Sequence, residues 1–212
     1  MIIAIDGTTA SGKGTIAKRL AAKYGLPHMD TGCLYRATAV AAIKQGIALD
    51  DAEGLERIAD TLDPAAYSDA ELRTGEAGKA ASKVAVIPEV RRALFDLQRA
   101  FATQPGGALL DGRDIGTVIA PDADVKLWVD ANVEQRGYRR WREYLGYGQT
   151  ISLDEVIKQL RIRDERDQSR KDAPATIATD AVLIDTTDLT IDAAVEKAIA
   201  AVEAVFARGK TV

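Results

Sequence analysis

The first fifteen residues constrain the fold more than any other stretch, because a short apolar run there gives way to a glycine-rich loop. The run from Ile2 to Ile5 is typical of a strand buried on both faces. Gly7 and Gly12 then enclose four residues and Lys13 follows, which is the G-x-x-x-x-G-K spacing of a P-loop. Such a loop brings backbone amides, a helix N-terminus and a mobile lysine to the oxygens of a polyphosphate. The sequence therefore predicts a phosphate site between a first strand and a first helix.

An ordinary turn before a helix is the alternative interpretation of this loop. We favour the P-loop because the motif, the preceding strand and the following helix agree. The residue after the lysine is Gly14, and the hydroxyl comes one position later, at Thr15. The resulting GKGT resembles nucleoside monophosphate kinases rather than switch GTPases, and the chain has no N-K-x-D segment for reading guanine.

Composition limits the class of protein. A chain of 212 residues fits one domain with a substantial core. Its net charge of −4 disfavours a general nucleic-acid binder, so any anion site must be a local cluster. Cys33 is the only cysteine, which excludes an intrachain disulfide and favours a reducing compartment. With no signal-like start and no membrane-length apolar run, we expect a cytoplasmic monomer without nucleic-acid or membrane partners.

Further buried strands are expected at residues 26–30, 108–111, 125–129 and 181–184, with helical segments between them. Strands that alternate with helices form parallel βαβ units. We therefore expect an α/β fold in three layers, a single P-loop domain whose parallel sheet has about five strands flanked by helices.

Two further motifs follow predicted strands. These are DTGCLYR at 30–36 and DGRDIGT at 111–117, and the carboxyl ends of parallel strands lie at the same edge of the sheet as the P-loop. Near the C-terminal third, Arg163, Asp167 and Arg170 are spaced to share one helix face. Arginine and aspartate from three segments should therefore converge on a bound polyphosphate, with room for a second anion. The only histidine, His28, has no nearby His or Cys partner, and we interpret it as structural.

Residues 136–172 carry the densest positive charge. Two predicted helices there each hold four arginines: Arg136, Arg139, Arg140 and Arg142, then Arg161, Arg163, Arg166 and Arg170. A solvated helical hairpin is the usual explanation for such a run. Because arginines dominate here in an acidic chain, we favour a mobile cover that closes over an anionic substrate.

The motifs DTGCLYR, DGRDIGT and RIRDERDQSR, in this order behind GKGT, resemble bacterial cytidylate kinases, which phosphorylate CMP and dCMP with ATP. The resemblance runs nearly end to end. It implies an ATP phosphate site formed by Gly7, Thr8, Thr9, Ala10, Ser11, Gly12, Lys13, Gly14 and Thr15. It implies a CMP site formed by Thr31, Tyr35, Arg36, Ser82, Arg91, Arg113, Asp114, Arg163, Asp167 and Arg170.

Within the implied CMP site, three groups of residues have different roles. The acceptor phosphate would bind Arg36, Arg113 and Arg170. The cytosine would contact Ser82, Arg91 and Asp114. The sugar would lie near Tyr35, Arg163 and Asp167. Thr31 stands where a serine is common in the family and keeps the hydroxyl.

The implied reaction is in-line transfer of the ATP γ-phosphoryl group to the 5′-phosphate of CMP. A phosphate monoester has a second pKa of about 6, so the acceptor is already anionic and needs no general base. Catalysis then depends on positioning and charge neutralisation by Mg²⁺ that enters with ATP. Thr15 is a candidate Mg²⁺ ligand, and Asp111 a candidate acceptor through water. The expected catalytic cations are Lys13, Arg113, Arg163 and Arg170.

The resemblance also divides the chain. The expected core is 1–34, 105–135 and 178–212, with a nucleoside-monophosphate-binding arm at about 35–104 and a lid at about 136–172. Bacterial members usually carry a three-stranded insert after the helix that ends near Leu62, and residues 63–67 leave no room for it here. The arm that selects the base is therefore expected to be short.

Two other functions remain open. One is a P-loop kinase for UMP, AMP or a small metabolite. An alcohol acceptor would need a carboxylate base, for which Asp30 and Asp114 are the candidates. The other is a non-enzymatic nucleotide-binding module whose arginine hairpin reports the bound state to a partner.

Overall fold

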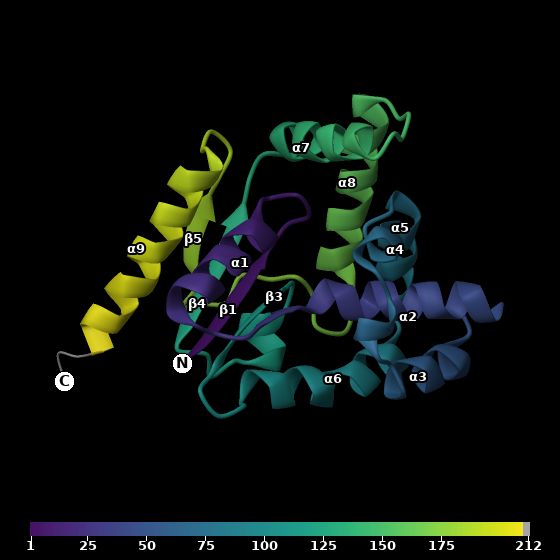
Figure 1. The fold of residues 1–212 in the computed structure, drawn as a ribbon, viewed down its shortest axis with the longest axis horizontal. Coiled ribbons are helices and arrows are strands. Elements are labelled where there is room, and N and C mark those ends of the chain that lie inside the picture. The colour runs from purple at the N-terminus through teal and green to yellow at the C-terminus, as the bar shows by residue number, and fades with distance from the viewer. Residues whose placement is uncertain (210–212) are drawn as a thin grey trace.

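A computed structural model of the chain describes residues 1–209 and shows a sheet of five strands that are all parallel (Figure 1). The strands lie in the order β2-β3-β1-β4-β5, with the P-loop strand at the centre. Every neighbouring pair is parallel. The strand bounds are β1 Ile2–Gly7, β2 His28–Asp30, β3 Ala108–Gly112, β4 Val125–Asp130 and β5 Val182–Asp185. The expected α/β sheet is confirmed.

Helices connect and cover the strands. The α-helices are α1 Lys13–Tyr24, α2 Thr31–Gln45, α3 Ala52–Asp60, α4 Asp69–Leu72, α5 Gly75–Val84, α6 Pro88–Ala102, α7 Val133–Gly146, α8 Leu153–Ser169 and α9 Ile191–Gly209. A 3₁₀ turn, η1, spans Pro64–Ala66, and a π-helical turn, η2, spans Ile115–Ile119.

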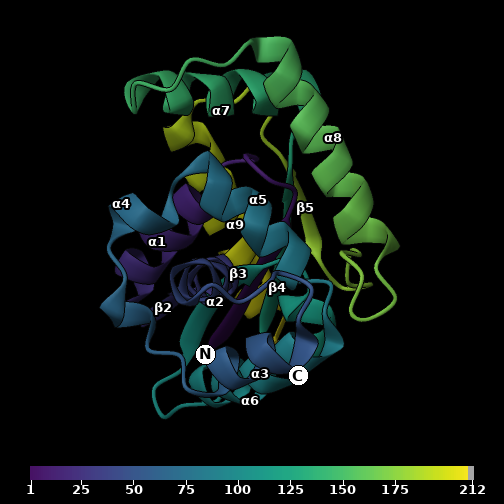
Figure 2. The same cartoon turned by 90° about the vertical axis from the view of Figure 1, so that its right-hand side faces the viewer.

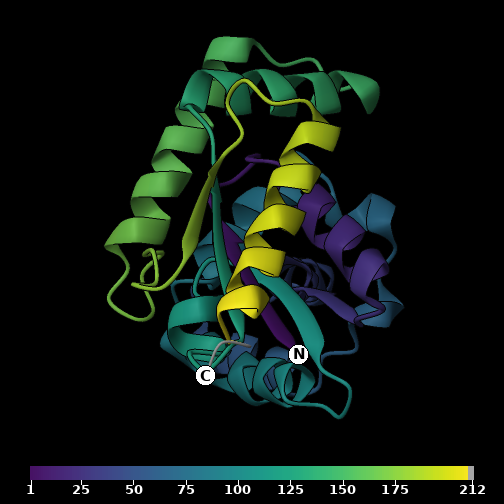
Figure 3. The ribbon, with the colours of Figure 1, turned by 90° about the vertical axis from the view of Figure 1, so that its left-hand side faces the viewer.

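The sheet is buried between two layers of helices. On one face, Leu20 of α1 and Ala198 of α9 pack against Ile5, and Figure 3 shows α9 lying along this face beside α1. On the other face, Ile115 of η2 packs against Leu110 together with residues of α6. All five of these side chains are buried, so both faces of β1 and β3 are excluded from water. This is the three-layer arrangement expected from the alternating strands and helices.

The helices between β2 and β3 have an apolar core of their own. Leu34 of α2, Leu55 of α3, Val84 of α5 and Leu94 of α6 are all buried in one cluster, which Met29 of β2 also contacts. A fourth, small cluster around Tyr144 joins α7 to α8. Figure 2 shows the α7–α8 hairpin above the sheet edge, with α8 passing beside α5.

Three local expectations are corrected. The second strand begins at His28 rather than residue 26, because the Leu26 amide donates to Ala21 O at the C-terminal cap of α1. The glycine-containing segment 144–150 between the two arginine-bearing helices suggests a loop, but α7 continues to Gly146. Arg170 lies just past α8 in an extended conformation, so it does not share a helix face with Arg163.

Candidate active site

A cavity of about 300 Å³ opens where the P-loop, the start of α2, α5 and α8 meet. Six arginines and two lysines line it, against five acidic residues, in a chain whose net charge is −4. The positive charge is therefore concentrated at this cavity, as an anion site requires. Among the predicted site residues, those that line it are Thr8, Thr9, Ala10, Ser11, Gly12, Lys13, Gly14, Thr15, Thr31, Tyr35, Arg36, Ser82, Asp111, Arg113, Asp114, Arg163, Asp167 and Arg170.

Gly7 and Arg91 do not line the cavity, although both belong to the predicted site. Gly7 has a φ of +153°, and a Cβ at this position would lie 2.0 Å from the carbonyl oxygen of Val129 on β4. Glycine is therefore needed so that the chain can leave β1 against its neighbour. Arg91 is buried behind the cavity wall, where it pairs with Asp114 and donates to the Tyr35 hydroxyl at 3.2 Å.

The P-loop lysine is held by β3. Lys13 Nζ lies 2.6 Å from Asp111 Oδ2, and His28 Nε2 lies 2.8 Å from Asp111 Oδ1. Burial raises the pKa of Asp111, but the charge of Lys13 and the hydrogen bond from His28 outweigh it, so the pKa falls below its usual value. The Thr31 hydroxyl donates to the backbone carbonyl of the same aspartate at 2.9 Å. Asp111 therefore connects the P-loop to β2 and α2.

Several of the site arginines are paired with aspartates, either within one motif or between two. Arg36 donates to Asp30 at 2.8 Å. Arg113 donates to Asp167 at 3.0 Å and to the Thr9 hydroxyl at 2.6 Å. The DGRDIGT segment thus contacts the P-loop and α8 through one guanidinium.

Arg163 has a buried Nε without a hydrogen-bond partner among residues 1–209, as Arg36 also does. Burial, followed by the like charge of Arg113, lowers the pKa of Arg163 to about 10. The positive charge of Arg163 is therefore only partly balanced, by the carboxylate of Asp167. The cavity therefore favours an added anion beside Arg113 and Arg163.

Asp114 pairs with two cations. Arg91 and Arg170 both pair with its carboxylate, the latter at 3.3 Å. The nearby Ser82 hydroxyl accepts a hydrogen bond from Arg166 Nη1 at 2.9 Å. Sequence reasoning placed Arg166 only in the general arginine run, because no local pattern reveals a contact between α5 and α8.

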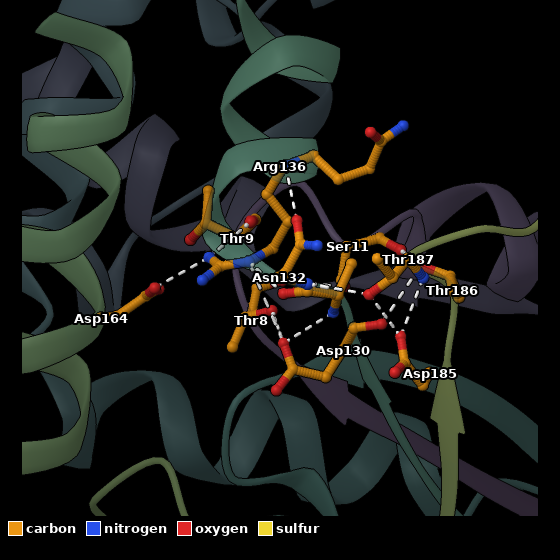
Figure 4. A network of polar contacts seen from close by, with 12 residues as sticks. Thr8, Thr9, Ser11, Asp130, Asn132, Arg136, Asp164, Asp185, Thr186 and Thr187 are labelled. Carbon is orange, nitrogen blue, oxygen red and sulfur yellow. Dashed lines mark hydrogen bonds and ion pairs between the residues drawn. The ribbon is translucent and has the colours of Figure 1, made fainter. Parts of the chain in front are cut away.

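The P-loop is hydrogen-bonded to residues at the ends of β4 and β5 and to the α7–α8 hairpin (Figure 4). Buried Arg136 donates to the Thr9 carbonyl at 3.2 Å and pairs with Asp164 of α8 at 2.8 Å. Thr8 donates to Asp130 at 2.6 Å, and Thr186 donates to the Ser11 carbonyl at 2.7 Å. The P-loop backbone and α8 therefore share one polar network.

The cavity is lined by oxygen atoms of the kind that bind Mg²⁺. Residues 1–209 hold no group of three or more acidic, His or Cys side chains that could bind a metal ion by themselves. The carboxylates of Asp30 and Asp111 and the hydroxyl of Thr15 all line the cavity. Mg²⁺ is usually held by one or two carboxylates together with substrate phosphates, so these residues fit an ion that arrives with a nucleotide.

A central strand that leads into a P-loop, in a parallel sheet with arginines gathered over one cavity, defines a P-loop kinase, a phosphotransferase. The family model for cytidylate kinase matches residues 3–204, and the chain belongs to this family. A relative named cytidylate kinase from Xanthobacter autotrophicus is 55% identical over 96% of this chain and 98% of its own length. Another of the same name, from Methylocella silvestris, is 54% identical over 96% of this chain and 94% of its own length. An uncharacterized protein from Eubacterium ventriosum shares the fold, with a TM-score of 0.54, 15% identity, and coverage of 96% of this chain and 98% of that chain.

Because the alignments with these two relatives span most of both chains, their lengths are close to that of this chain. In the described part of the chain, no helix is long and apolar enough to cross a membrane.

Proposed function

We propose that this protein transfers the γ-phosphoryl group of ATP to CMP and dCMP. The observation that carries the proposal is that one cationic cavity joins the P-loop to arginines from α2, α8 and the segment after β3. Two phosphate groups that must react need such a shared positive site, because their mutual repulsion opposes close approach. Membership of the cytidylate kinase family supports CMP as the acceptor.

In this proposal the P-loop binds the ATP phosphates and Lys13 follows the transferred group. The CMP phosphate binds Arg36, Arg113 and Arg170, which line the cavity from three different segments. Arg163 lies beside Arg113 and neutralises charge that develops during transfer. Mg²⁺, when bound with ATP, would neutralise the phosphate oxygens from the side of Thr15 and Asp111.

The base would lie against Ser82 and Asp114, with Tyr35 and Asp167 near the sugar. Arg91 would act from behind the wall, because its guanidinium orients Asp114 and the Tyr35 hydroxyl. Asp114 also holds Arg170. The same carboxylate would therefore link recognition of the base to recognition of the phosphate.

We also propose that about 136–172 acts as a lid and about 35–104 as the arm that binds the acceptor. The hydrogen bond from Arg166 of α8 to Ser82 of α5 supports this division, because it joins the two segments at Ser82 in the cavity wall. Closing the two segments would exclude water and limit ATP hydrolysis. We propose that the protein works as a cytoplasmic monomer without nucleic-acid partners.

The test is release of ADP from Mg-ATP with CMP, dCMP, UMP, dUMP and AMP offered one at a time. Fast turnover confined to CMP and dCMP is the expected result. Equal use of UMP or AMP would show a broader kinase, and ATP binding without any acceptor-dependent turnover would show a binding module. Lys13→Ala is expected to lose turnover with unchanged circular dichroism, and an unchanged kcat would remove Lys13 from the mechanism.

A further inference from the structure

A series of polar contacts in the cavity includes one side chain, His28, that the proposed reaction does not use. It runs from Lys13 Nζ through the two carboxylate oxygens of Asp111 to His28 Nε2, with separations of 2.6 and 2.8 Å. The Asp111 side chain is 1% exposed, so water has little access to it. An ionised carboxylate only accepts hydrogen bonds, and His28 Nε2 therefore carries the proton of this contact.

His28 is placed as part of the cavity wall and not as a core residue. It begins β2, at the edge of the sheet, and its side chain is 16% exposed. Asp30, two residues further along the same strand, lines the same cavity, as the period of a strand requires. Met29 between them packs instead among the apolar residues behind the cavity.

We propose that His28 is a positioning residue for Lys13. By bonding one oxygen of Asp111, it fixes the carboxylate so that only the other oxygen faces the lysine. The amine is thereby kept beside the P-loop and yet remains exchangeable onto a phosphate. The inference rests on the proposed transfer from ATP, in which Lys13 must leave Asp111 for the nucleotide.

The physical reason lies in competition for Lys13. If His28 is absent, both oxygens of Asp111 become available to the amine, and the carboxylate loses a partner that shares its negative charge. The buried pair of Lys13 and Asp111 then becomes stronger, and its exchange for ATP oxygens becomes less favourable. Binding of ATP and transfer should weaken, while binding of CMP through its own arginines should not.

Three variants separate positioning from simple packing. His28→Leu removes the donor, and His28→Gln places an amide N–H near the position of Nε2. We expect His28→Leu to weaken ATP binding about tenfold by calorimetry without CMP, equal to about 1.4 kcal/mol, and also to lower kcat. His28→Gln should recover most of the loss, and KM for CMP should stay unchanged in both. Met29→Leu, on the same strand but behind the cavity, is the matched control and should behave as the wild type.

A second readout needs neither nucleotide nor turnover. The chain has one histidine, so the imidazole of the untagged protein gives a single, assignable set of nitrogen and proton NMR signals. Lys13→Met should shift the His28 Nε2–H signal, because Asp111, the acceptor of that proton, loses its contact with the Lys13 amine. Met29→Leu should leave the signal unchanged. This outcome would stand even if the wild type failed to phosphorylate CMP, which would refute the proposed reaction alone.

The proposal is overturned by any of three results. In the first, Lys13→Met leaves the imidazole signals unchanged. In the second, His28→Leu binds ATP as the wild type does. In the third, His28→Gln is as impaired as His28→Leu, which would mean that the shape of the imidazole matters and its hydrogen bond does not.

Discussion

Asp6 gives the most quantitative prediction, because it is a carboxylate buried at the end of the central strand. It is 4% exposed and accepts hydrogen bonds from the backbone amides of Ile115 at 2.9 Å and Gly116 at 2.8 Å. Burial is the largest influence and raises the pKa of Asp6 from 3.8 to about 6, against the lowering effect of these two amides. The free energy of unfolding must therefore depend on pH through this group.

The direction follows from proton linkage. An acid whose pKa is higher in the folded state binds its proton more tightly there, so its contribution to stability is greatest below its unfolded pKa of 3.8 and is lost as pH rises through about 6. A difference of about two pKa units corresponds to about 3 kcal/mol at about 1.36 kcal/mol per unit. About 2 kcal/mol of this falls between about pH 4.5 and 7.5, the range in which unfolding is easily measured.

The assay is urea unfolding of the wild type and of Asp6→Asn across that range. Asparagine removes the titration and keeps one oxygen acceptor, and all other titrating groups cancel in the difference between the two proteins. At the acidic end the variant should be less stable by about 1 kcal/mol, the value of one hydrogen bond. As the pH rises to 7.5, the free energy of unfolding of the variant should increase by about 2 kcal/mol relative to that of the wild type. A difference that does not change with pH, or that changes in favour of the wild type as pH rises, would refute the reasoning.

Two further substitutions test the architecture of the P-loop by urea unfolding. Gly7→Ala would place a Cβ 2.0 Å from a β4 carbonyl oxygen at positive φ, and should lower stability by about 3 kcal/mol or more. Gly146→Ala, where a Cβ would meet nothing within 4 Å, is its control and should change stability by less than about 1 kcal/mol. Asp164→Leu should cost about 3 kcal/mol because it removes the 2.8 Å ion pair of the buried Arg136 and leaves only the 4.0 Å contact with Asp130. Glu134→Gln in an exposed ion pair should cost less than about 1 kcal/mol, and equal losses for the two ion-pair variants would contradict the network.

Local signals in the sequence predicted the elements well. Gly25 and Gly46 end α1 and α2 in the left-handed conformation, and the Asp51 side chain caps α3 by accepting from Gly54 N at 3.0 Å. Pro88 begins α6 at the position in a helix that proline favours. These features depend on neighbours within one helical turn, which is why the sequence alone reveals them. The π-helical turn η2 was missed because its first amides are held by Asp6, a residue far away in the chain.

The site could be predicted as a set of residues but not as a set of pairs. Parallel-sheet topology brings the motifs to one edge, and that step needs only strand ends. Which carboxylate faces which guanidinium depends on tertiary packing. Asp167 is spaced four residues from Arg163 on α8, but its carboxylate accepts from Arg113 of a different segment. His28 was interpreted as structural, although its spacing of two from Asp30 in a strand that ends at the site was a usable signal.

The pairs explain why the cavity carries both positive and negative side chains. Before substrate binds, Lys13 is paired with Asp111, Arg36 with Asp30 and Arg113 with Asp167. Without those carboxylates, the cations of the cavity would repel one another at short range in a partly buried place. Binding of two nucleotides is then an exchange of partners, in which phosphate oxygens replace carboxylates on cations that are already in position. An anion with a single charge gains little from such an exchange, whereas a polyphosphate can take several cations at once, and the cavity thereby selects for the substrates that the reaction needs.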